Sequence, residues 1–226
     1  AEARLGLGDP AGALAALESG KAMARTADAQ WQRERLRHDA ARAAGKADER
    51  LAAAEALVNL SGTGEPVRRA EAVSLAARAM EAMGQTERAD ALWERNSDAS
   101  LPVEYQREAV LRIAERLGAR SDLPKARARL ERFLTGRAAE PVWNAVRLAL
   151  GQVLFRQYAE ARGVTPLPAE IAGLPGQILG QLDVVLTNQP AAELVGPVQY
   201  LRGWCLWEDG MAAGITNQLK ESEAAF

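Results

Sequence analysis

The stretch "MGQTERADALWE", residues 83–94, decides the fold of this chain. Gly84 interrupts the helical pattern before it, and a new amphipathic pattern starts at once, with Ala89 and Trp93 four residues apart on one face. A glycine stop followed directly by another helix is typical of a hairpin of two helices. The small alanine allows the two helices to approach closely, and the large tryptophan fills the space beside them.

The same arrangement occurs near the start of the chain, in "LGLGDPAGALAALESG", residues 5–20. Here Gly8, Ala13 and Leu17 have the spacing of the glycine, alanine and tryptophan of the first stretch. Two copies of one turn indicate that the chain is built from repeated helical hairpins. Because little sequence precedes this first turn, we expect these residues to belong to a longer array that continues beyond both Ala1 and Phe226.

Helical periodicity recurs along the chain, and no segment alternates in the manner of a strand. The expected turn glycines are about 40 residues apart, a period that indicates a helical solenoid: Gly8, Gly45, Gly84, Gly118, Gly163 and Gly210. The predicted helices span 10–24, 28–44, 47–60, 66–83, 86–96, 103–118, 122–135, 140–161, 175–188, 192–209 and 216–226. Residues 163–176 are predicted to be a long connection with one short helical turn at most. We therefore expect an all-α protein, with residues 1–226 forming one repeat array.

Composition excludes several classes of protein. Hydrophobic residues make up 48% and charged residues 26%, as in an ordinary globular chain, while aromatic residues are only 5%, so a core of Ala, Leu and Val is expected. The formal net charge of −2 does not favour a nucleic-acid partner. No apolar run is long enough to span a membrane.

These patterns resemble the tetratricopeptide repeat superfamily. The second half of its signature matches best at Gly84, Ala89 and Trp93, with Ala77 at the small position before the glycine. Further partial matches are Leu150, Gly151 and Leu154, then Gly203, Leu206 and Gly210, and Pro190 eight residues after Leu182. The resemblance implies a right-handed α-solenoid of about six antiparallel hairpins whose concave surface binds a peptide or protein. A different α-solenoid with longer units is the alternative.

Two units depart from the family pattern. In the Gly45 unit, Arg50 stands where the alanine is expected. In the unit assigned to Gly118, about three extra residues are needed to bring Ala126 and Leu130 into register.

Groups for catalysis are few. His38 is the only histidine, on a charged helix where a surface or packing role is expected, and Cys205 lies at core spacing. Phosphate-binding glycine motifs and clusters of metal ligands are absent from the sequence. We therefore predict no enzyme activity, no cofactor and no metal.

Two surface features are candidate partner-binding sites. The first is the basic helix 28–44, where Arg35 and Arg42 share one side and Arg78 of the next hairpin is expected to face them. A basic groove for an acidic peptide is one interpretation, and a solvated arginine face is the other.

The second feature is the aromatic stripe of Tyr200, Trp204 and Trp207, on a helix that is also apolar at Val198 and Leu201. Such a helix either packs between neighbours or offers one face to a partner.

The sequence thus predicts a non-catalytic scaffold that binds a protein or peptide. The alternative is a regulatory or accessory repeat segment of a larger enzyme or of a transport or assembly machine. Abundant alanine and arginine with few lysines are typical of GC-rich bacteria, and the compartment, cytoplasm or periplasm, stays open.

Overall fold

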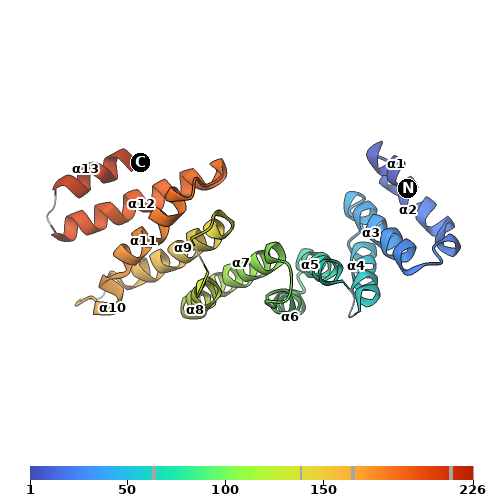
Figure 1. The fold of residues 1–226 in the computed structure, drawn as a ribbon, viewed down its shortest axis with the longest axis horizontal. Helices are drawn as coiled ribbons and strands as arrows, with labels where there is room; N and C mark the ends of the chain where they lie inside the picture. The colour runs from blue at the N-terminus through green and yellow to red at the C-terminus, as the bar shows by residue number, and fades with distance from the viewer. Residues whose placement is uncertain (63–64, 138, 164–165, 214–215, 226) are drawn as a thin grey trace. The chain divides into compact units, whose positions relative to one another are not determined.

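The computed structural model describes residues 1–62, 65–137, 139–163, 166–213 and 216–225 (Figure 1). All regular structure in these residues is helical, which confirms the predicted all-α class. The chain divides into two compact units, Ala1–Ala109 and Val110–Phe226, and the boundary falls within helix α7, Val103–Ala119.

The first unit contains α1 (Glu2–Gly6), α2 (Pro10–Ser19), the 3₁₀ turn η1 (Lys21–Met23), α3 (Ala27–Ala43), α4 (Ala47–Ser61), α5 (Pro66–Ala82), α6 (Thr86–Asn96) and the first residues of α7. In this unit, each helix from α1 to α5 packs on the next helix along the chain. Its main core cluster lies between α3, α4, α5 and α6, where small alanines surround Trp31, Leu57 and Met80. Alanine and leucine thus form most of this cluster, as expected.

The second unit contains the rest of α7, α8 (Leu123–Leu134), the 3₁₀ turn η2 (Pro141–Trp143), α9 (Asn144–Ala161), α10 (Ala169–Ala172), α11 (Leu174–Thr187), α12 (Ala192–Ala213) and α13 (Thr216–Ala225). Helix α9 packs on α8 and α11, and α12 packs on α11 and α13. The predicted connection 163–176 contains the short helix α10, as expected, and its last residues already belong to α11.

Four of the helices end in the same type of turn. At Gly84, the N–H of Gly84 donates to the carbonyl of Glu81 and the N–H of Gln85 donates to that of Met80, both at 2.9 Å. This is a Schellman motif, which needs one residue in the left-handed conformation. At the four turns of this type, the left-handed residues are Gly8, Gly45, Gly84 and Ser121, with φ of 75°, 68°, 72° and 59°. In each case the next helix begins two residues later.

The predicted turn at Gly118 is wrong. Helix α7 continues through Gly118 to Ala119, and Ser121 takes the left-handed conformation instead. Measured from Ser121, Ala126 and Leu130 have the spacing of Ala89 and Trp93 from the glycine, so no extra residues are needed. The four turns at 8, 45, 84 and 121 are then 37, 39 and 37 residues apart.

A second expected turn is also wrong, because Gly210 lies inside α12, which runs four residues beyond the predicted end.

Candidate functional site

The turn at Gly45 differs from its neighbours in the two residues that lie between its helices. At Gly84 and Ser121, the residue seven positions before the turn and the residue five positions after it are all buried alanines: Ala77, Ala89, Ala114 and Ala126. At Gly45 these positions hold His38 and Arg50. The hairpin of α3 and α4 therefore contains a polar pair where the others contain two methyl groups.

The two side chains are joined directly. His38 is 1% exposed, and its Nε2 accepts a hydrogen bond from Nε of Arg50 at 3.2 Å. A guanidinium can only donate, so the proton of the imidazole is on Nδ1. That nitrogen is 3.2 Å from Oδ1 of Asp39, to which it donates. His38 is thus held at both ring nitrogens.

The chain of contacts continues to α5. Arg35 pairs with Asp39 and donates through Nε to Oε1 of Glu71 at 2.6 Å. Burial alone would raise the pKa of Asp39, but the hydrogen bond from His38 and the nearby Arg35 outweigh it and hold this pKa below its usual value. For Arg35, burial lowers the pKa, while Glu71 and Asp39 outweigh that effect and raise it. We call Arg50, His38, Asp39, Arg35 and Glu71 the His38 network.

The charges of two further arginines act on Arg50. Burial lowers the pKa of Arg50, and the positive charges of Arg42 on α3 and Arg78 on α5 lower it further. Arg78 pairs with Glu108, with Nη2 2.5 Å from Oε1. Arg42 is exposed and, in the described part of the chain, neither Arg42 nor Arg50 forms an ion pair with a carboxylate. We call Arg42, Arg50 and Arg78 the arginine cluster.

The three arginines predicted from the sequence have different surroundings in the structure. The charges of Arg42 and Arg78 both act on Arg50, whereas Arg35 lies in the His38 network between two carboxylates. Arg50 was not predicted as a site residue. Its departure from the alanine pattern was the signal that could have found it.

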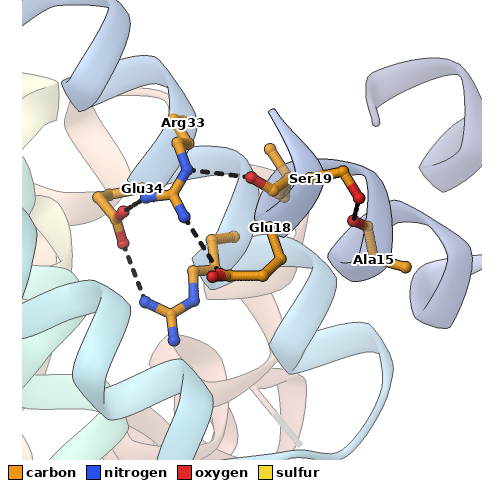
Figure 2. A network of polar contacts seen from close by, with 7 residues as sticks. Ala15, Glu18, Ser19, Arg33 and Glu34 are labelled. Atoms are coloured by element: carbon orange, nitrogen blue, oxygen red, sulfur yellow. Dashed lines mark hydrogen bonds and ion pairs between the residues drawn. The ribbon is translucent and has the colours of Figure 1, made fainter. Parts of the chain in front are cut away.

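Other arginines of α3 connect helices within the unit. Figure 2 shows Arg33 reaching from α3 to α2, where its Nε donates to the carbonyl of Leu17 at 3.1 Å. Arg33 also pairs with Glu18 and with the buried Glu34, to which Arg37 donates from the same helix. Arg33 and Arg37 are thus paired with carboxylates of their own unit.

The aromatic stripe lies on α12 in the second unit. Val198 and Leu201 are buried, and so is Cys205, as predicted. Trp204 packs edge-on against Phe155 of α9, with ring centroids 4.9 Å apart. Tyr200 and Trp207 are 60% and 40% exposed. Only part of the stripe is therefore covered, and its role in partner binding stays a prediction.

In the described residues, no group of His, Cys, Asp and Glu side chains is arranged to hold a metal ion. No helix in the part of the chain that the structure describes is long and apolar enough to cross a membrane. Comparison of the sequence with protein-family models and with curated proteins gives no match.

Proposed function

We propose that this chain is a scaffold of degenerate tetratricopeptide-like repeats, arranged as a right-handed α-solenoid, that binds an acidic segment of a partner protein at the arginine cluster. The four Schellman turns at near-constant spacing support the repeat assignment. The observation that carries the binding proposal is Arg50, which replaces a small interior residue yet forms no carboxylate ion pair in the described chain.

The geometry of Arg50 suits recognition of a carboxylate. Its Nε is occupied by His38, so the side chain is fixed, while neither terminal nitrogen forms a hydrogen bond within the described residues. A guanidinium that is already oriented loses less entropy when it binds a carboxylate through two parallel hydrogen bonds. Arg42 and Arg78 repel Arg50 in the free protein, and an incoming anion relieves that repulsion.

A fluorescent peptide of ten glutamates, with a glutamine peptide of equal length for comparison, tests this proposal by anisotropy. We expect the double variant Arg42→Gln, Arg50→Gln to bind the acidic peptide at least about tenfold more weakly, because two charge-assisted contacts are lost. The matched control is Arg4→Gln, Arg88→Gln, which removes the same charge from exposed arginines of the same unit that pair with Asp9 and Glu55.

Equal weakening in both double variants would show that only the net charge matters. Unchanged binding in the cluster variant, or no preference for the acidic peptide, would contradict the proposal.

A further inference from the structure

A second polar site lies near the start of α5. A pocket of about 410 Å³ opens between α5, α6 and the segment that leads to α7. Its polar lining is formed by Arg69, Arg95, Asn96, Asp98 and Ser100. Arg69 is nine residues before Arg78, about 14 Å along the helix axis, so this pocket is separate from the arginine cluster.

Asn96 in this pocket has an unused acceptor. The side chain is fully buried, and its Nδ2 donates to the carbonyl of Ala70 and to Oγ of Ser74, both at 2.8 Å. The bond to Ala70 fixes which end of the amide is nitrogen, because a carbonyl oxygen can only accept. Oδ1 is buried and has no hydrogen-bond partner. Buried polar atoms nearly always have a partner, so this oxygen calls for a donor from outside the chain.

The pocket also carries uncompensated positive charge. In the described residues, Arg69 and Arg95 form no ion pair and no side-chain hydrogen bond. Asp98 is the acidic residue of the lining, and its Oδ1 accepts from the backbone N–H of Ser100 at 2.7 Å. Hydrogen bonds from Ser100 lower the pKa of Asp98, and the charge of Arg69 lowers it further. The lining therefore holds two cations and one anion.

We propose that this pocket binds a small carboxylate that carries a hydrogen-bond donor on the adjacent carbon, as in an α-amino acid or an α-hydroxy acid. The carboxylate lies between Arg69 and Arg95, and the adjacent N–H or O–H donates to Oδ1 of Asn96. An ammonium donor gains a further attraction from Asp98, so the amino acid is the better ligand. The pocket is large enough to admit a ligand of this class.

Calorimetric titration of the whole chain with three probes tests the proposal: L-alanine, L-lactate and acetate. L-Alanine has an ammonium donor, L-lactate has a hydroxyl donor, and acetate has neither. We expect L-alanine to bind at least about tenfold more tightly than acetate, with L-lactate between them, because only the first two satisfy Asn96.

The substitutions Arg69→Gln and Arg95→Gln are each expected to weaken L-alanine binding about tenfold, whereas Arg88→Gln, an exposed arginine of the same helix α6, leaves it unchanged. In spectra of the ¹⁵N-labelled protein, the side-chain amide signal of Asn96 is expected to shift with L-alanine.

Equal binding of all three probes would overturn the role of Asn96. No binding of any probe up to about 10 mM would overturn the site and leave water as the partner of Oδ1. Both results are independent of the acidic-peptide experiment, which uses other arginines.

Discussion

The hairpins α3–α4 and α5–α6 have the same type of turn, but different side chains lie between their helices. Around Gly84 the interface is formed by two buried alanines and the fully buried Trp93, whose indole nitrogen donates to Glu81 at 2.6 Å. Around Gly45 the alanine positions hold His38 and Arg50, joined by a hydrogen bond. The Gly84 hairpin is packed for stability, whereas the Gly45 hairpin contains buried polar groups that must satisfy one another. Local departures of this kind from a repeat pattern are expected at functional positions.

The largest difference in stability between the two hairpins is expected from Trp93→Ala. The substitution leaves a cavity between α5 and α6 and removes one hydrogen bond to Glu81, so we expect a loss of about 3–5 kcal/mol in the free energy of unfolding, measured by urea denaturation. The corresponding position of the Gly45 hairpin is already alanine, the buried Ala54. A loss below about 1 kcal/mol would contradict the assigned role of Trp93.

A smaller loss, about 2 kcal/mol, is expected from His38→Ala, because Arg50 and Asp39 each lose a buried partner. The double variant His38→Ala, Arg50→Ala restores the alanine pair of the other hairpins. We expect it to recover most of the lost stability, so the two substitutions are not additive. Additive losses in urea denaturation would show that the two residues act separately.

The His38 network also predicts a dependence on pH. Because the pKa of Asp39 is lowered in the folded state, its contribution to stability is fully present above the usual aspartate pKa and is lost as the pH falls through the folded value. We expect Asp39→Asn to reduce the free energy of unfolding at pH 7, and this difference from the wild type to shrink below about pH 4. A difference that is constant from pH 7 to pH 3 would show that the carboxylate contributes nothing.

The smallest effect is expected at the turns. Ser121 adopts a left-handed φ of 59°, which glycine takes without steric cost, so Ser121→Gly is expected to raise the free energy of unfolding by about 0.5–1 kcal/mol. Gly84→Ala makes the reverse change in the same motif and is expected to lower it by about 1 kcal/mol. If both substitutions changed stability in the same direction, the shared turn geometry would be contradicted.

Most helices could be predicted from the sequence, because apolar spacing and turn residues act locally. Helix α6 begins and ends at the predicted residues, and α4 differs by one residue. The turn after α7 was predicted at Gly118 instead of Ser121, because glycine is the usual left-handed residue. No local pattern indicates that a serine takes this conformation.

The candidate site was predicted less well. Whether an arginine is paired depends on carboxylates that come from other helices. Arg35 of α3, for example, pairs with Glu71 of α5. The unpaired oxygen of Asn96 likewise depends on contacts with α5 that no local pattern reveals.

We infer that the Gly45 hairpin holds Arg50 for binding and not for stability. Measuring acidic-peptide affinity and urea stability together for His38→Ala, Arg50→Ala tests this role of Arg50 most directly. We expect a free energy of unfolding within about 1 kcal/mol of the wild type and an affinity reduced about tenfold. A variant that loses stability while it binds the peptide as tightly as the wild type would contradict this role.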